Sequence, residues 1–232
     1  MSGIGRIQAK RSESRNPQSN LPPMREVWFK DGDQAFVTPV ASGEDGDNLL
    51  DEIYLYTYKS GQRWVTLLSD KDVDTSGVPD NYRPSNKFAF WGFVHEIIHP
   101  EKRADDWIEV AGPNGRKLYK EEVNDFRVIG LSFGRSDYIW NQLVDVYSDW
   151  GALNKGVLRV KRTGTGMYDT SYTIAATARD SVIPDEQQNG KDDLPPIKEY
   201  YKTRYGGQSQ NSTAGKVSVK EEASESSDDN LF

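Results

Sequence analysis

The sequence contains no cysteine. Disulfides, thiolate metal sites and a cysteine nucleophile are therefore excluded, and the absence is typical of a protein from a reducing compartment. Long apolar runs are missing as well, since no stretch approaches the roughly 20 apolar residues that cross a bilayer. The first residues also lack the apolar segment of a secretory signal. We therefore expect a cytoplasmic protein.

Histidine is scarce, and both histidines fall in one motif. His95 to His99 reads HEIIH, which matches the H-E-x-x-H pattern of zinc proteases. That pattern binds zinc on a helix, where the two imidazoles share one face. Here it lies in an aromatic run that favours a strand and ends at Pro100. We therefore predict no catalytic residue, no metal site and no cofactor, and keep a zinc hydrolase as the enzymatic alternative.

Positive charge is in deficit, with a formal net charge of −7. Overall acidity argues against a purely basic, sequence-blind DNA binder, because phosphate neutralisation supplies most non-specific affinity. The charge is uneven, however: cations gather before residue 27, and acids dominate from Glu221 onward. We predict a flexible basic arm (residues 1–24), one folded domain (25–205) and a disordered acidic tail (206–232).

Period-2 alternation and turn residues predict short strands throughout the folded part. We expect strands on both sides of Asp31-Gly32 and at 52–58, 63–68, 87–99, 107–110, 116–119, 124–131, 156–162 and 169–177. One helix is expected at 136–150 and a shorter one within 195–205, with a linker at 183–191. This order predicts a mainly β protein, an OB-fold-like small β-barrel with one packed α-helix.

The hairpin predicted at residues 156–177 carries the main binding hypothesis. Its sequence is GVLRVKRTGTGMYDTSYTIAAT, in which cations alternate with buried-type residues before the turn. Cations beside aromatic rings suit single-stranded nucleic acid, which offers phosphates and base faces together. An ordinary surface hairpin with solvated cations is the alternative. The residues predicted to bind are an outward row of cations and the tyrosines near the turn: Arg159, Lys161, Arg162, Tyr168 and Tyr172.

A second aromatic set lies in the strand expected at 52–58, which reads EIYLYTY. Alternation places Tyr54, Tyr56 and Tyr58 on one face of that strand. We predict that at least one of them stacks on a base, while packing into a second core layer is the alternative.

The chain ends in SSDDNLF, which joins negative charge to a terminal apolar pair. Such a peptide can dock in an apolar pocket with a basic rim on a partner protein, whereas a merely solvated tail has no need of Leu-Phe. The predicted partner-binding residues are Asp228, Asp229, Leu231 and Phe232.

Three stretches resemble the single-stranded DNA-binding proteins of tailed bacteriophages: EVWFKDGDQAFV, the tail SSDDNLF, and LRVKRTGTGMYDTSYTI, which looks like the family's R-x-G-x-G…T-x-Y segment. The resemblance implies an OB-fold protein without catalysis, in the infected bacterial cell. It would coat and protect single-stranded DNA in replication, recombination and repair, without sequence specificity, and recruit replication or recombination proteins through its tail. Some relatives hold a Cys/His zinc ribbon, for which this chain has no cysteine. The alternative is an acidic interaction or regulatory protein that binds proteins only.

Overall fold

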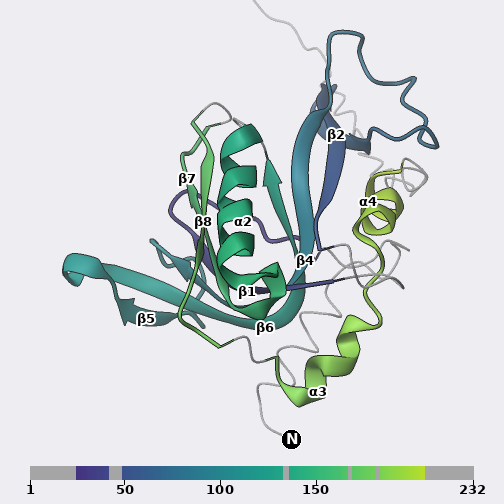
Figure 1. Ribbon diagram of the computed structural model, residues 1–232. Helices are drawn as coiled ribbons and strands as arrows, with labels where there is room; N and C mark the ends of the chain where they lie inside the picture. Colours follow the sequence, from purple (N-terminus) through teal and green to yellow (C-terminus); the bar gives the residue numbers. More distant parts are fainter. Residues whose placement is uncertain (1–24, 42–48, 133–135, 167–168, 181–182, 207–232) are drawn as a thin grey trace, which may run out of the picture. The chain divides into compact units, whose positions relative to one another are not determined.

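The computed structural model describes residues 25–41, 49–132, 136–166, 169–180 and 183–206. In these ranges the chain forms one eight-stranded sheet with few helices (Figure 1). All ladders between named strands are antiparallel. The fold is therefore mainly β, as the alternation predicts. Within the described ranges, no helix has both the length and the apolar character needed to cross a membrane.

The predicted strands and helices are largely present. The strands are β1 (Gln34–Val40), β2 (Asp51–Ser60), β3 (Arg63–Leu68), β4 (Ser85–His99), β5 (Ile108–Ala111), β6 (Lys117–Ser132), β7 (Leu158–Thr163) and β8 (Ser171–Ala176). The helices are α2 (Ser136–Trp150), α3 (Asp185–Gln188) and α4 (Ile197–Tyr205). Short 3₁₀ turns lie at Pro113–Gly115, Leu153–Lys155 and Asn189–Lys191.

β4 is the central strand, as its apolar sequence predicts. Along one edge, β4 pairs with β6 over nearly the whole length of β4. Along its other edge, β4 pairs first with β2 and then with β1. Both β4 and β6 bend, and β6 sweeps beneath α2 (Figure 1). A β-bulge marks this bend: the β4–β6 register shifts between Val94 and Glu96, and Asn124 of β6 has a φ of 42°. Bulges increase local twist and bending.

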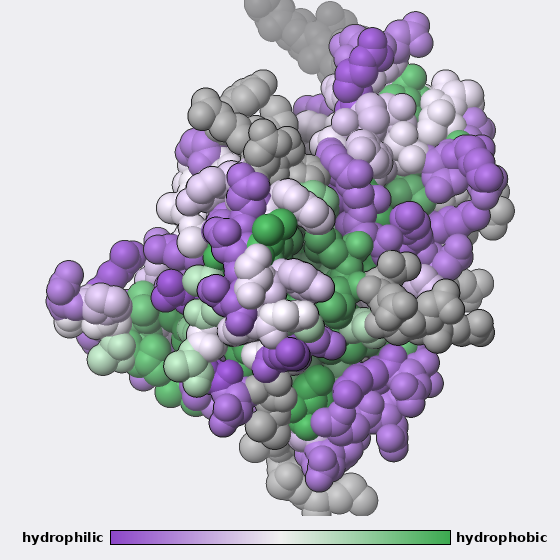
Figure 2. Space-filling model, in the orientation of Figure 1, coloured by the Kyte–Doolittle hydropathy of each residue, from purple (hydrophilic) through white to green (hydrophobic). Residues whose placement is uncertain are grey.

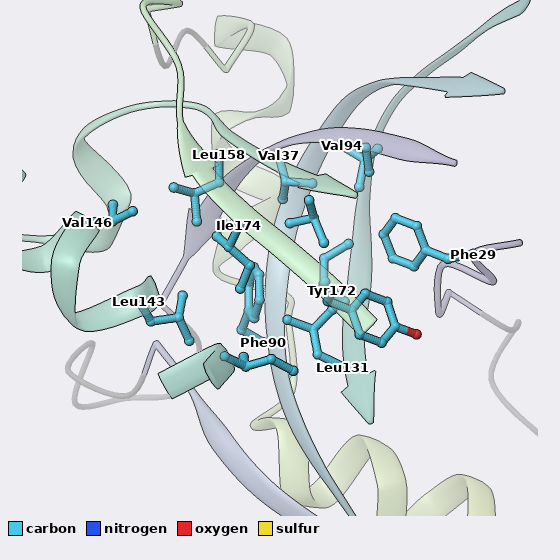
Figure 3. Close-up of a cluster of buried hydrophobic side chains, with 14 of the residues drawn as sticks. Phe29, Val37, Phe90, Val94, Leu131, Leu143, Val146, Leu158, Tyr172 and Ile174 are labelled. Atoms are coloured by element: carbon cyan, nitrogen blue, oxygen red, sulfur yellow. The ribbon is translucent and has the colours of Figure 1, made fainter. Parts of the chain in front are cut away.

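Both faces of the sheet are covered. On one face, Leu143 and Val146 of α2 pack against side chains of β1, β4, β7 and β8 (Figure 3). On the other face, α4 and the residues just before it cover Trp91, whose indole Nε1 donates to Pro195 O at 2.8 Å. Phe90 belongs to the first core and Trp91 to the second. β4 is thus buried on both faces, which explains why it reads as a continuous apolar run.

Three local predictions are wrong. Residues 25–30 form no strand, because Glu26 makes only an isolated bridge to Val128 and β1 pairs with β4 and β7 instead. The strands expected at 116–119 and 124–131 form one strand, β6, because the bulge lets its ladder continue. Residues 183–191 are no linker: Ile183 is buried in the second core and α3 follows it.

The sheet is open between β6 and β8, so it is not closed into a barrel, and the predicted OB-fold-like barrel is not confirmed. α2 covers the edge of β8. The side-chain amide of Gln142 donates from Nε2 to Tyr172 O at 3.2 Å and accepts from Ile174 N at 2.7 Å. One side chain thus satisfies two backbone groups, as a neighbouring strand would. At the edge of β6, Val128 exchanges backbone hydrogen bonds with residues 25–27 at 2.8 and 2.9 Å.

Candidate nucleic-acid interface

Strand register brings two predicted cations onto the sheet face that points away from α2. Leu158 and Val160 of β7 are fully buried in the core against α2. Since strand side chains alternate, Arg159 and Lys161 lie on the opposite face. Arg159 is directly opposite Phe36 of β1, and Lys161 is opposite Gln34.

A third cation, Arg179, joins this face from the segment after β8. Its guanidinium carbon lies 3.9 Å from the centroid of the Phe36 ring, and its Nη1 donates to Glu96 Oε1 at 2.7 Å. Half of its side-chain surface stays exposed (50%). We call Phe36, Arg159, Lys161 and Arg179 the basic face.

Sequence reasoning missed both Phe36 and Arg179. For Phe36 the alternation of β1 was an available signal. Ala35 and Val37 are fully buried, and alternation leaves Phe36 between them on the outer side of the strand. No sequence signal places Arg179, because its position depends on how the chain leaves β8 and crosses over β1.

Arg162 does not belong to the basic face, so the predicted common row is wrong for this residue. The strand continues to Thr163, and alternation places Arg162 on the same side as Leu158 and Val160. There its guanidinium donates to Phe29 O, and from Nη2 to Thr170 Oγ1 at 3.1 Å. Arg162 thus links the segment before β1 to the β7–β8 turn.

We expect Arg162→Ala to lower the free energy of unfolding by about 1–3 kcal/mol, because it leaves part-buried acceptors without their charged donor. Urea unfolding measures this change. The matched control is Arg159→Ala, at an exposed position, which should alter stability by less than about 0.5 kcal/mol. If the Arg162→Ala protein were as stable as the wild type but showed a reduced salt dependence of DNA binding, the structural role would be contradicted. Arg162 would then contact phosphate, as the sequence predicted.

The tyrosine ladder of β2 is only partly accessible. Tyr54 is 41% exposed and Tyr56 is half-buried, but Tyr58 is buried. The loop between β3 and β4 covers Tyr58, placing the Tyr82 ring edge-on at 5.8 Å between centroids. Base stacking therefore stays a prediction for Tyr54 and Tyr56, while the expected exposure of Tyr58 is wrong.

Tyr172 is also buried, in the core against α2, where its ring meets Phe29 edge-on at 5.9 Å (Figure 3). The expectation that it offers a ring to a base is therefore wrong. The other predicted binding residues lie outside the described residues: Tyr168 near the turn, and Asp228, Asp229, Leu231 and Phe232 in the tail.

The β2–β3 hairpin exposes an aromatic ring that sequence reasoning also missed. Trp64 of β3 is 69% exposed and lies opposite Lys59 of β2, while Arg63 lies opposite Ser60 at the turn. Residues 57–66 contain these two cations and no acid. The available signal was a tryptophan beside a Ser-Gly turn. The hairpin tip thus combines a ring with positive charge, as single-strand binding requires.

Trp64→Ala should weaken single-strand binding by about 1 kcal/mol, roughly fivefold, the lower end of the range for one base–aromatic stack. Fluorescence anisotropy of a labelled oligonucleotide measures the loss. The control is Trp140→Ala on α2, which replaces another exposed tryptophan that no cation accompanies on its helix. Equal losses in the two variants would contradict a specific stack at the hairpin.

A groove of about 860 Å³ adjoins the basic face, with Gln34 and Lys161 lining its edge. Its other walls are the turn before β1, the end of β4, the β5–β6 turn and the start of the β7–β8 turn. Cations outnumber acids among the lining residues: Lys30, Arg103, Arg116, Lys161 and Arg162 against Asp31 and Glu101. This local excess of positive charge attracts a polyanion despite the negative net charge of the chain.

A buried ion network holds one side of the groove. Asp33, 1% exposed, accepts from Arg103 at 2.7 and 3.0 Å and from Lys30 N at 2.8 Å. His99 places Nδ1 2.9 Å from Asp33 and Nε2 3.1 Å from Glu121. The network therefore fixes the positions of Lys30 and Arg103, two groove residues.

The pKa values of this network follow from burial and pairing. Burial acts to raise the pKa of Asp33, but hydrogen bonds from His99 and Arg103 outweigh it, and the pKa lies below its ordinary value. Burial acts to lower the pKa of His99, but its bonds to Asp33 and Glu121 prevail, and the pKa is raised. Asp33 and His99 therefore favour their charged forms.

The H-E-x-x-H motif lies on β4, and its histidines do not share a face. His95 bonds Thr38 Oγ1 at 2.9 Å beside the basic face, whereas His99 is buried in the ion network. Burial, followed by the charge of Arg179, lowers the pKa of His95. The paired-imidazole geometry of zinc proteases is thus not formed. Among the residues placed by the structure, no group of three or more potential ligands could hold a metal.

The sequence matches no family model and no curated protein.

Proposed function

We propose that this protein binds single-stranded DNA without sequence specificity, along the basic face and the adjoining groove. The observation that carries the proposal is the grouping of Arg159, Lys161 and Arg179 on one face of the sheet, with Arg159 opposite Phe36 and Arg179 over its ring. A flexible strand can offer phosphates to these cations and bases to exposed rings at once. In this proposal the protein coats and protects single-stranded DNA in phage replication, recombination and repair, and its acidic tail recruits partner proteins.

The strand order supports an OB-fold-like architecture. An OB-fold is a five-stranded, partly open Greek-key barrel, in which a helix commonly lies between strands three and four. Here β1, β4, β6, β7 and β8 correspond to those five strands, and α2 lies between β6 and β7. The pairings one–two, two–three, one–four and four–five are all present. The β2–β3 hairpin is then an insertion after the first strand.

The comparison with OB-folds also explains why the proposed interface lies beside the face that OB-folds usually use, and not on it. OB-folds bind oligonucleotides on strands two and three and on the loops after strands one and four. In this chain α4 covers the corresponding outer face of β4, where Tyr200 packs on Trp91 with ring centroids 5.3 Å apart. The part of this outer sheet face that stays accessible lies beside β1 and β7, and the groove at the β7–β8 turn adjoins it.

A labelled oligo(dT) titration tests the proposal. Binding should be saturable, similar for mixed sequences, weaker for duplex DNA, and reduced as salt rises from about 50 to 200 mM, because phosphate contacts release counterions. A folded protein without affinity at low salt would refute the proposal. It would favour the alternative, a regulatory protein that binds only other proteins.

A further inference from the structure

On the basis of the proposed function, we infer that Glu96 is a positioning residue for single-strand binding, which holds Arg179 where its guanidinium reaches a phosphate. Glu96 Oε1 accepts from Arg179 Nη1 at 2.7 Å. The guanidinium carbon of Arg179 lies 3.9 Å from the centroid of the Phe36 ring. Phe36 and Glu96 are direct partners in the β1–β4 ladder. One pair of facing strand residues thus supplies both contacts to the guanidinium.

A β-bulge in β4 turns Glu96 toward the basic face. Val94 and Ile97 both belong to the core against α2, although they are three residues apart. Since strand side chains alternate with a period of two, one residue between them is extra. Both ladders of β4 shift in register between Val94 and Glu96. Bulges re-aim side chains, and this bulge places Glu96 on the outer side of the sheet, beside Phe36.

The path of the chain after β8 brings Arg179 to Glu96. Thr177 anchors this segment, because its N and its Oγ1 donate to Val157 O at 3.0 and 2.7 Å. Thr177 Oγ1 also accepts from Arg179 N at 3.3 Å. Thr177 thus holds the main chain of Arg179. Phe36 and Glu96 hold its side chain, and such preorganisation lowers the entropy that a long side chain loses on binding.

The ion pair leaves Arg179 accessible and adds little to the stability of the fold. Half of the Arg179 side-chain surface is exposed, against 17% for Glu96, and an ion pair with an exposed partner stabilises a protein only weakly. A guanidinium carries five N–H groups, so donors on its exposed part can reach a phosphate oxygen. An acid on a DNA-binding surface ordinarily weakens binding by repulsion. Glu96 should strengthen it, because its bond keeps Arg179 in place.

The test compares Glu96→Leu with Glu96→Gln in the full chain. Both variants remove the negative charge, but only Gln keeps a side-chain oxygen that can accept from Arg179. In oligo(dT) titrations, Glu96→Leu should bind about fivefold more weakly than Glu96→Gln, the factor that corresponds to immobilising one flexible side chain on binding. When Arg179→Gln is added to each variant, the two proteins should bind equally.

Nuclear magnetic resonance reports the position of Arg179 without DNA. Since the guanidinium lies over the Phe36 ring, ring currents should shift the side-chain protons of Arg179 upfield. We expect this shift in the wild type and in Glu96→Gln, and its loss in Glu96→Leu.

The matched control is Asp145→Leu, an equal charge change at an exposed acid of α2, which packs on the other face of the sheet. Figure 2 shows pale and green surface in the region of α2, where one more apolar side chain changes little. Asp145→Leu should keep the upfield shift of Arg179 and should not weaken DNA binding.

Three results would overturn the inference alone. The first is equal DNA binding by the two Glu96 variants. The second is an upfield Arg179 shift that persists in Glu96→Leu, because Glu96 would then not position the guanidinium. The third is a difference between the two variants that remains when Arg179 is replaced. A wild-type protein that binds no oligo(dT) would overturn the proposed function and the inference with it. If Glu96→Leu does not fold, Glu96→Ala takes its place, because alanine also lacks the acceptor.

Discussion

Replacing Arg159, Lys161 and Arg179 together with Gln should weaken single-strand binding about 100-fold at 0.1 M salt, with the protein still folded. Each neutralised phosphate on a single strand adds about 0.7 to the slope of log affinity against log salt. Three lost contacts should therefore reduce the slope by about 2, which is about 100-fold in affinity at 0.1 M relative to a 1 M reference. Oligo(dT) titrations over a salt series measure both quantities.

The matched control changes the net charge equally on another part of the domain. Lys71 lies in the loop after β3, and Lys198 and Lys202 lie on α4. Their joint replacement by Gln should leave the salt slope within experimental error. If both triple variants lost the same slope, binding would depend on overall charge and the basic face would have no special role. If neither triple variant had a reduced salt slope, the phosphates would bind to other residues.

The sequence predicts those elements whose pattern is local. β3 matches its predicted bounds, and α2 does so as well, because a helix of this length is defined by its own apolar stripe and by Gly151 after its end. β4 is identifiable because burial on both faces leaves an uninterrupted apolar run. The β7–β8 hairpin follows from alternation on both sides of a glycine-rich turn.

The sequence does not predict features set by contacts between distant segments. Asp31-Gly32 does form a turn, with Gly32 at a φ of 80°, but Gly32 N donates to Arg162 O of β7, which is distant in the sequence, and not to residues before the turn. Tyr58 has the alternation of an outward residue and is buried because a loop folds over it. The β4 register shift that separates His95 from His99 requires both neighbouring strands.

The candidate site divides in the same way. Arg159 and Lys161 are predictable from the pattern of their own strand. Phe36 joins them only through the pairing of β1 with β7, and Arg179 only through the path of the chain after β8. The predicted strand at 156–162 already contains Arg162, and its alternation places Arg162 on the same side as Leu158 and Val160. Grouping Arg162 with the outward cations was therefore an error of interpretation that the pattern itself could have prevented.

Asp33→Ala should lower the free energy of unfolding by about 3–5 kcal/mol, because removing one member of a buried ion pair leaves its partners uncompensated. Arg103 would lose both carboxylate bonds, and His99 would lose the carboxylate at its Nδ1. Urea unfolding at neutral pH measures the change. The control is Asp105→Ala, at an exposed position two residues from Arg103, which should cost less than about 0.5 kcal/mol.

The pH dependence of unfolding separates this network from a purely steric effect. The pKa of Asp33 is lowered on folding, so its stabilisation is present above its ordinary pKa of about 4 and is lost as pH falls through the lower folded value. The pKa of His99 is raised, so its stabilisation is complete below about 6.5 and is lost as pH rises through the higher folded value. The wild-type protein should therefore gain most from the network between these limits. Asp33→Ala should flatten both dependences, because Asp33 is one partner of the pair in each case. An unchanged pH profile in a destabilised Asp33→Ala protein would show that Asp33 stabilises the fold by packing and by its bond to Lys30 N, without the ion network.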